Sequence, residues 1–344
     1  MKVLVTGGCG FLGSNICTFY KAKGAEVIAY DNLAKHEFAR NRYMKPEARV
    51  YCKELLEKTG VTVLVQDIRD KEKLLAAAQG CDYICHTAAQ PAMTISWEDP
   101  ELDFSTNTRG TFNVLEAARQ LHIPVAVCSS IHTYGPDRIN ASLKEEKTRY
   151  ARTPVRIGDD EPLLQGMVTP LHASKRSNEI YVQSYIDTFG LKAACFRLTG
   201  IYGPNQFGGE DHGWVANFSI RAVIGEALTI FGTGKQTRDI LYASDVAEAF
   251  DSFFRTPNPG IYTIGGGEEN MISLLESIEL IGELLGIRPL VKYEKERPGD
   301  LRYFVADYSK MLNATGWEPK VRPKEGVSRL LAWVKENEGL FIKK

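Results

Sequence analysis

Closely spaced glycines near the start of the chain constrain its fold more than any other feature. Residues 6–13 read Thr-Gly-Gly-Cys-Gly-Phe-Leu-Gly, after a strand predicted at 3–6 and before a helix predicted at 11–23. The run contains both G-x-x-G-x-x-G and G-x-G-x-x-G. A glycine loop in this context lets the backbone approach a pyrophosphate, which the free N–H groups of the helix N-terminus bind. The sequence therefore predicts a dinucleotide site formed by Gly7, Gly10, Phe11, Leu12 and Gly13.

The rest of the first half alternates short apolar runs with helical stretches. This alternation is typical of a parallel sheet covered by helices. Strands are expected at 27–30, 62–66, 82–87, 125–129 and 193–198, and helices at 71–79, 107–120 and 174–188. The polar segment 137–169 reads as a long functional loop. We expect a Rossmann-type, doubly wound α/β fold with a smaller mixed α/β C-terminal substrate lobe, divided near 1–185 and 186–344, with the lobes interleaved.

Asp31 ends the second predicted strand, near the offset of roughly 20 residues at which a carboxylate meets the adenosine ribose hydroxyls. Asn32 follows it, and no arginine comes directly after to neutralise a 2′-phosphate. NAD is therefore favoured over NADP.

Composition and charge narrow the classes of function that the chain can have. The formal net charge of -1 gives no electrostatic reason to expect nucleic acid as a partner. No apolar run approaches the roughly 20 residues of a membrane span, and no signal peptide is recognised, so we expect a cytoplasmic protein without a membrane partner. The 7 cysteines are scattered without a matching Cys/His pair. We read them as buried reduced thiols and expect no metal site.

Longer motifs add a resemblance. They include TGGCGFLGSN at the start, QDIRD around Asp67, HTAAQPAM from His86, NTRGTFNVLEAAR from Asn107, FRLTGIYGPNQF from Phe196 and GKQTRDILYASD from Gly234. With these runs the chain resembles the extended short-chain dehydrogenase/reductase (NAD-dependent epimerase/dehydratase) family over essentially its full length. Within that family it is most similar to the CDP-paratose (tyvelose) 2-epimerase group.

The resemblance implies NAD as cofactor, a nucleotide-sugar as substrate and a homodimer as the assembly. It assigns further cofactor contacts to Asp67, Ile68, Ala88, Ala89, Asn107, Ser129, Lys175 and Thr199. It assigns substrate contacts to Gln90, Asn205, His212, Arg238, Arg297 and Arg302, of which the arginines would clamp the diphosphate. The planar guanidinium suits that task because it presents several donors in a fixed geometry.

The catalytic signature of the family is incomplete. Ser130 and Lys175 align with the family's catalytic Ser/Thr and Lys, but Leu171 occupies the position of the tyrosine in Tyr-x-x-x-Lys. A leucine cannot move a proton. We expect His132, just past Ser130, to replace the phenol, because imidazole titrates near neutral pH. His172 is the second candidate.

We expect NAD-dependent epimerisation through a transient keto-sugar, at C2 by analogy. Two alternatives remain open: a reaction that begins with oxidation at C4, such as 4-epimerisation or decarboxylation, and a noncatalytic binding protein that has lost the tyrosine. Dehydration is disfavoured, because Ile131 and His132 stand where a 4,6-dehydratase carries its Asp-Glu pair.

Overall fold

A seven-stranded parallel sheet forms the centre of the molecule. The computed structural model describes residues 1–35 and 41–342. The strands lie in the order β3-β2-β1-β4-β5-β8-β12, and every neighbouring pair is parallel. Their bounds are β1 Lys2–Thr6, β2 Glu26–Asp31, β3 Thr62–Val65, β4 Tyr83–His86, β5 Val125–Ser130, β8 Ala193–Leu198 and β12 Gly260–Ile264. The expected doubly wound α/β fold is confirmed.

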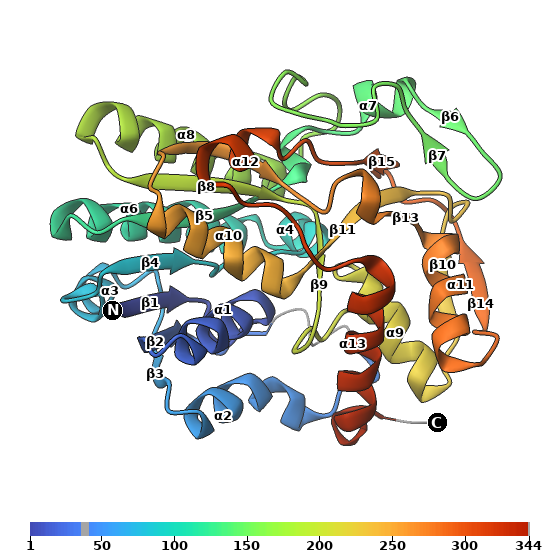
Figure 1. Ribbon diagram of the computed structural model, residues 1–344, viewed down its shortest axis with the longest axis horizontal. Helices are drawn as coiled ribbons and strands as arrows, with labels where there is room; N and C mark the ends of the chain where they lie inside the picture. The colour runs from blue at the N-terminus through green and yellow to red at the C-terminus, as the bar shows by residue number, and fades with distance from the viewer. Residues whose placement is uncertain (36–40, 343–344) are drawn as a thin grey trace.

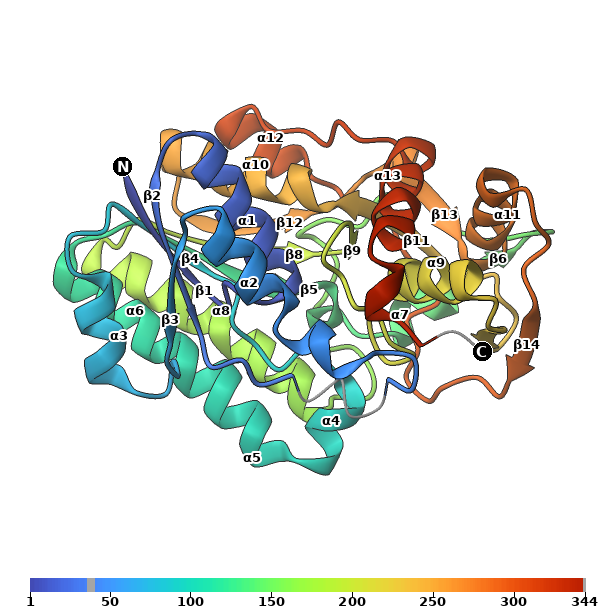
Figure 2. The ribbon, with the colours of Figure 1, turned by 90° about the horizontal axis from the view of Figure 1, so that it is seen from below.

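Helices cover both faces of this sheet. Figure 2 shows α3 (Lys71–Ala78), α6 (Gly110–Leu121) and α8 (Pro170–Phe189) on one face, with α1 (Phe11–Ala22), α2 (Tyr51–Lys58) and α10 (Ala243–Arg255) on the other. Because helices enclose the central strands, their side chains are buried on both faces, and β1, β4 and β8 read as nearly continuous apolar runs.

The order of the strands creates a crevice at one edge of the sheet. From β1 the chain runs outward through β2 and β3, then returns to the other side of β1 with β4 and β5. The carboxyl ends of β1, β2 and β4 are level, since Thr6 pairs with both Tyr30 and His86. In open parallel sheets, ligands bind outside the carboxyl ends at such a reversal.

The C-terminal lobe closes over that edge (Figure 1). It contains a mixed sheet in which β11 (Thr237–Tyr242) pairs with β9 (Gly200–Tyr202), β13 (Met271–Ser273) and β15 (Tyr303–Phe304). A second, two-stranded sheet joins β10 (Leu228–Phe231) to β14 (Val291–Glu294). The helices of this region are α9 Trp214–Ile224, α11 Leu274–Leu285, α12 Ser309–Thr315 and α13 Pro323–Glu336. β8 and β12 follow residue 185 in the sequence, yet both strands complete the large sheet. The division of the chain at residue 185 therefore stays a proposal, in which the two lobes are interleaved.

The segment 137–169, expected to be an irregular loop, contains short regular elements. These are α7 (Asp137–Ala141) and a hairpin of β6 (Lys144–Glu145) and β7 (Tyr150–Ala151). The Arg149 guanidinium ties the hairpin to the lobe through two hydrogen bonds to the Glu276 carboxylate, 2.8 and 2.7 Å long. The hairpin is held in place by residues more than 100 positions away in the sequence. A local sequence pattern does not reveal such contacts.

Helix boundaries differ from the expected ones in two places that matter for the site. α8 begins at Pro170, four residues earlier than predicted, because Thr169 caps it. The helix predicted at 107–120 is preceded by α4 (Met93–Glu98), α5 (Pro100–Asp103) and a π-helical turn at Phe104–Arg109. The sequence analysis also missed α2.

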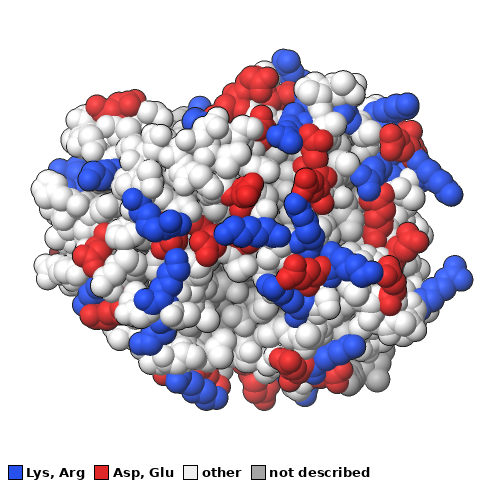
Figure 3. Space-filling view, in the orientation of Figure 1, with Lys and Arg blue, Asp and Glu red and all other residues white. Residues whose placement is uncertain are grey.

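Acidic and basic side chains intermingle on the face drawn in Figure 3, over both lobes. All seven cysteines are free thiols, and all except the partly exposed Cys128 are buried. None of the helices within 1–35 and 41–342 is both long and apolar enough to span a bilayer.

Candidate active site

A cavity of about 530 Å³ lies at the carboxyl ends of the parallel strands, beneath the C-terminal lobe. Most residues singled out from the sequence line it. From the glycine loop and sheet these are Gly7, Gly10, Phe11, Leu12, Gly13, Asp31, Asn32, Ile68, Ala88, Ala89, Gln90, Ser129, Ser130, His132, Lys175 and Thr199. From the lobe they are Asn205, His212, Arg238 and Arg297. His172, Asp67, Asn107 and Arg302 are not among the lining residues.

The glycine loop is packed too tightly for side chains at Gly7, Gly8 and Gly13. A Cβ on Gly7 would lie 2.6 Å from the Ala88 nitrogen, and one on Gly13 would lie 2.0 Å from the Gly7 oxygen. Gly7 also has φ +70°, in the left-handed region that favours glycine. Gly10 caps α1 and faces the cavity with only the Gly7 oxygen, 3.1 Å away, near its missing Cβ.

The carboxylate of Asp31 is fixed in position at the end of β2. Its carboxylate accepts hydrogen bonds from the backbone N–H groups of Cys9, 2.9 Å away, and Leu33, 2.7 Å away. Lys35 also lines the cavity, and its Nζ donates to the Cys9 oxygen at 2.8 Å. The sequence analysis missed Lys35, since an isolated lysine after a strand carries no signal of its own.

Ser130 and His132 lie where β5 ends in a 3-10 turn, Ile131–Thr133. The Ser130 hydroxyl accepts a hydrogen bond from the His132 backbone N–H at 3.2 Å. Burial, reinforced by the neighbouring His172 and Arg238, lowers the pKa of His132 to about 3. The imidazole is therefore neutral at physiological pH and able to accept a proton.

His172 forms part of the cap at the start of α8. It is the third residue of α8, and its Nδ1 accepts a hydrogen bond from the Thr169 backbone N–H at 3.1 Å. The Thr169 hydroxyl is 2.6 Å from the same nitrogen. This capping box places the ring behind His132, with the two ring centres 5.6 Å apart. His172 therefore stabilises the helix start and packs on His132 without lining the cavity.

Lys175 and Leu171 are one helical turn apart on α8, and both line the cavity. The Lys175 Nζ donates to the Cys128 oxygen at 3.4 Å, and burial lowers the pKa of the amine. Leu171 is 2% exposed and brings an apolar side chain to the position where the family signature has a phenol.

Two of the three predicted arginines, Arg238 and Arg297, line the cavity. Arg238 donates to the Thr237 oxygen at 2.9 Å and to the Leu301 oxygen. Arg297 lies over the Phe231 ring, 3.9 Å from its centre. Arg302 instead forms a two-pronged ion pair with Glu296, at 2.6 and 2.7 Å, and is not part of the cavity wall. Its assignment as a diphosphate ligand stays a prediction, since it lies outside the cavity wall and two of its five N–H donors bind Glu296.

Asp67 and Asn107 lie outside the cavity wall, and their cofactor contacts stay predictions. Asp67 bonds to Arg69 and Asn32, and the hydrogen bonds from Arg69 lower the pKa of its carboxyl to about 2. Its neighbours Gln66 and Ile68 line the cavity instead. Asn107 is buried and holds the backbone of Gln90 through its Oδ1 at 2.8 Å and its Nδ2 at 3.0 Å. Asn107 therefore affects the cavity indirectly, by fixing the backbone of Gln90.

The residues present fit a dinucleotide. The close-packed glycines leave a cradle that side chains would fill, and the buried Thr199 hydroxyl in the cavity wall has no hydrogen-bond partner among the described residues. Buried polar atoms without partners are rare and point to a missing ligand or water. By contrast, the described part of the chain holds no group of three or more His, Cys, Asp or Glu side chains arranged for a metal.

Further residues that line the cavity were not singled out from the sequence, although several adjoin residues that were. Besides Lys35 and Gln66 they include Met93, Glu210, Asp211, Trp214 and Asp300. Asp211 is next to the predicted His212, and its carboxylate is 3.6 Å from the Arg297 guanidinium. The position of Asp211 next to His212 was its only signal in the sequence.

The buried histidines predict how stability depends on pH. Burial lowers the pKa of both His86 and His132 to about 3, whereas an unfolded histidine titrates near 6.5. As pH falls below about 6.5 the unfolded state takes up protons that the folded state does not, so stability is lost. We expect the unfolding free energy of the apo protein to fall between pH 6.5 and 5, at a slope approaching about 2.7 kcal/mol per unit. Urea titrations at pH 7.5, 6 and 5 measure it, and a flat profile would contradict the assignment. His132→Asn should reduce the slope.

Comparison with known proteins gives consistent matches. The profile of the NAD dependent epimerase/dehydratase family matches residues 3–265. CDP-paratose 2-epimerase of Salmonella typhi is 35% identical over 97% of this chain and 99% of its own. The structure of a Thermus thermophilus UDP-glucose 4-epimerase with NAD has 33% identity and a TM-score of 0.78, over 97% of this chain and 99% of that one. A Thermotoga maritima UDP-glucose 4-epimerase with UDP-glucose has 27% identity and a TM-score of 0.82, over 98% and 100%.

Proposed function

Because the chain belongs to the NAD dependent epimerase/dehydratase family, we propose that it epimerises a nucleotide-activated sugar at C2 through a transient keto intermediate. One observation carries the proposal: a single cavity is lined by the glycine cradle, by Arg238 and Arg297, and by Ser130, His132 and Lys175. NAD, held by the glycine cradle and Asp31, would supply reversible hydride transfer to and from the ring carbon, with the keto-sugar turning its opposite face between the two transfers. The choice of C2 is supported by the CDP-paratose 2-epimerase relative.

Ser130 and His132 would manage the hydroxyl proton. The Ser130 hydroxyl polarises the sugar hydroxyl, and the neutral His132 imidazole accepts its proton. The proximity of Arg238, one cause of the depressed His132 pKa, is useful here. Burial is the main cause of the low His132 pKa, and a substrate diphosphate bound to Arg238 would offset the smaller contribution of that charge, so the pKa of His132 should rise on substrate binding.

Lys175 and Arg297 would position the two ligands. The buried Lys175 amine is directed at the Cys128 carbonyl and is available to the nicotinamide ribose. Arg297, supported by the Phe231 ring and Asp211, would hold the diphosphate. Leu171 has no proton to give, and it is the observation that favours the alternative of a noncatalytic binding protein.

Proton NMR of the purified protein with NAD and a panel of CDP-, UDP- and GDP-sugars tests the proposal. We expect one nucleotide-sugar to be converted into its C2 epimer, seen as a new anomeric signal with a changed coupling to H2. Conversion at C4 would replace the C2 assignment with the 4-epimerase or decarboxylase alternative. Tight binding of NAD and a nucleotide-sugar with no conversion of any member of the panel would favour the noncatalytic alternative.

The same reaction run in D2O distinguishes two routes. If the keto-sugar turns its face to the same cofactor, the hydride never exchanges with solvent. The inverted carbon should therefore carry no deuterium after full equilibration. Deuterium at that carbon would show deprotonation beside a ketone and would exclude the proposed route.

We also propose a homodimer formed through α6 and α8. Phe112 and Tyr181 are 37% and 41% exposed, and their rings contact each other with centres 6.1 Å apart; the neighbouring Ile180 is 55% exposed. Together they form an apolar face on adjacent helices, which suits a second copy of the chain. Light scattering should give twice the mass of one chain, and Phe112→Lys/Tyr181→Glu should give the monomer. A wild-type monomer at micromolar concentration would contradict the assignment.

A further inference from the structure

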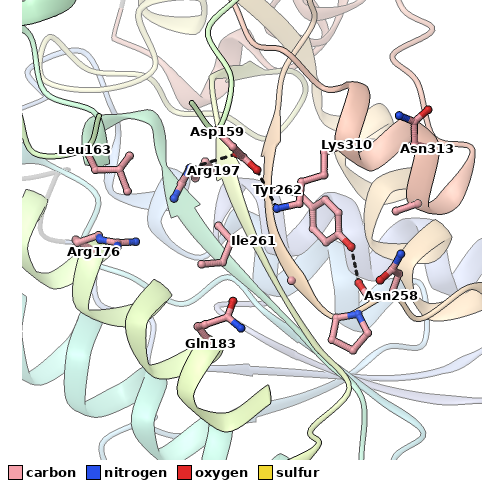
Figure 4. Close-up of a pocket in the computed structure, with 13 residues that line it drawn as sticks. Asp159, Leu163, Arg176, Gln183, Arg197, Asn258, Ile261, Tyr262, Lys310 and Asn313 are labelled. Carbon is pink, nitrogen blue, oxygen red and sulfur yellow. Dashed lines mark hydrogen bonds and ion pairs between the residues drawn. The ribbon is translucent and has the colours of Figure 1, made fainter. Parts of the chain in front are cut away.

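A second cavity, of about 630 Å³, lies at the edge of the large sheet. Its walls come from α8, from the edge strand β12 with the residues before it, and from α12 (Figure 4). It shares no lining residue with the candidate active site. The buried carboxylate of Glu179, which accepts a hydrogen bond from the Ser129 hydroxyl at 2.8 Å, stands between the two. The proposed function makes no use of this cavity.

Positive charge is in excess on its walls. Arg176, Arg197 and Lys310 line it, against the single carboxylate of Asp159. Arg197 is neutralised from behind by Glu179, through two hydrogen bonds of 2.9 Å. Lys310 pairs with Asp159 at 2.8 Å. Arg176 also pairs with Glu179, so Glu179 and Asp159 together face three cations and one net positive charge remains.

Arg176 and Lys310 keep donors for a ligand. In the contacts described, Arg176 gives one hydrogen bond, from its Nη1 to Glu179 at 2.8 Å. A guanidinium has five N–H donors and an ammonium has three. The Asp159 side chain is 40% exposed, so its pairing with Lys310 is weakened by solvent and open to competition. An oxyanion placed between Arg176 and Lys310 would meet several charge-assisted donors.

The remaining walls suit a hydroxylated molecule. Asn258, Asn313 and Gln183 bring amide groups, and Ile261 adds an aliphatic surface (Figure 4). Amides hydrogen-bond to hydroxyls. We propose that this cavity binds a phosphorylated sugar-sized metabolite, whose phosphate lies between Arg176 and Lys310 and whose hydroxyls meet the amides. The volume lies within the range of small-molecule sites.

Isothermal titration calorimetry of the full chain, already saturated with NAD, tests this with three probes: glucose 1-phosphate, glucose and inorganic phosphate. We expect glucose 1-phosphate to bind with a dissociation constant of about 1 mM or lower. Inorganic phosphate should bind more weakly, and glucose should not bind. Equal affinity for glucose 1-phosphate and inorganic phosphate would reduce the site to an adventitious anion contact and overturn the proposal, as would no binding of the sugar phosphate at about 10 mM.

Variants locate the binding. Lys310→Gln, at an exposed position, and Arg176→Ala should each weaken glucose 1-phosphate by about tenfold or more, because each removes charge-assisted hydrogen bonds. Lys324→Gln is the matched control, since Lys324 is an exposed lysine paired with Glu283 elsewhere on the surface. Arg238→Ala separates the two cavities. If binding disappears in Arg238→Ala and persists in both Lys310→Gln and Arg176→Ala, the ligand occupies the active site and the proposal is wrong.

Discussion

Replacing His132 by alanine is expected to lower kcat on the nucleotide-sugar substrate by about 10²–10⁴-fold, the usual contribution of a positioned acid–base group. The imidazole lines the cavity from within the 3-10 turn Ile131–Thr133, and no phenol stands at position 171 to take over the proton. Affinity for NAD should change little, because the cofactor cradle is formed by other residues. Steady-state kinetics and NAD titration measure the two quantities separately.

A matched pair of variants separates chemistry from packing. The His132 ring packs against His172, so alanine also leaves a gap. His132→Asn fills most of that gap with a side chain that does not titrate, and it should lose activity as severely as His132→Ala. If His132→Asn keeps nearly full activity, the imidazole does not move the proton.

Leu171→Tyr should restore activity to His132→Ala. Position 171 faces the cavity one turn before Lys175, so a phenol there would lie beside the amine, as the family signature has it. The double variant should recover at least about tenfold of the lost kcat, with the acid–base work moved to the phenol. Failure of every His132 variant to change the rate would remove His132 from the mechanism whatever the tyrosine does.

The sequence reveals this site well where function depends on local pattern. The glycine loop, Asp31 at the end of a strand, and Ser130 and Lys175 in their motifs were all recognisable, because spacing along one strand–turn–helix unit fixes where such residues point. The parallel sheet was predictable from local pattern as well: its central strands are buried on both faces and read as apolar runs.

Other features depend on contacts that the sequence does not display. Thr169 and His172 form a cap at the start of α8, and the His172 ring is not part of the cavity wall. Arg302 pairs with Glu296 six residues earlier, whereas Arg238 and Arg297 line the cavity. An arginine looks the same in sequence whether it is already paired or directed into a cavity, so the geometry of its neighbours has to decide.

Gly13→Ala is expected to abolish NAD binding and to destabilise the protein by about 3 kcal/mol or more, the upper range for forced overpacking. The new Cβ would lie 2.0 Å from the Gly7 oxygen and 2.8 Å from the Gly8 Cα. Both are backbone atoms, so no side-chain rotation relieves the clash, and α1 must separate from the loop. Gly13 lies inside α1, where alanine has the higher helix propensity, but that advantage is only about 1 kcal/mol. The steric cost therefore exceeds the gain.

Gly10→Ala tests the cradle without breaking the fold. Gly10 has φ −78° and ψ 178°, which alanine adopts freely, and its Cβ would meet only the Gly7 oxygen at 3.1 Å. The methyl group would project where the pyrophosphate approaches the backbone, so we expect NAD affinity to fall by at least about tenfold while stability stays within about 1 kcal/mol. Gly339→Ala is the neutral control, since no atom lies within 4 Å of its Cβ position. Urea unfolding and NAD titration of all three variants decide the matter. If Gly13→Ala folds and binds NAD like Gly339→Ala, close packing of the loop is not what forms the cofactor site.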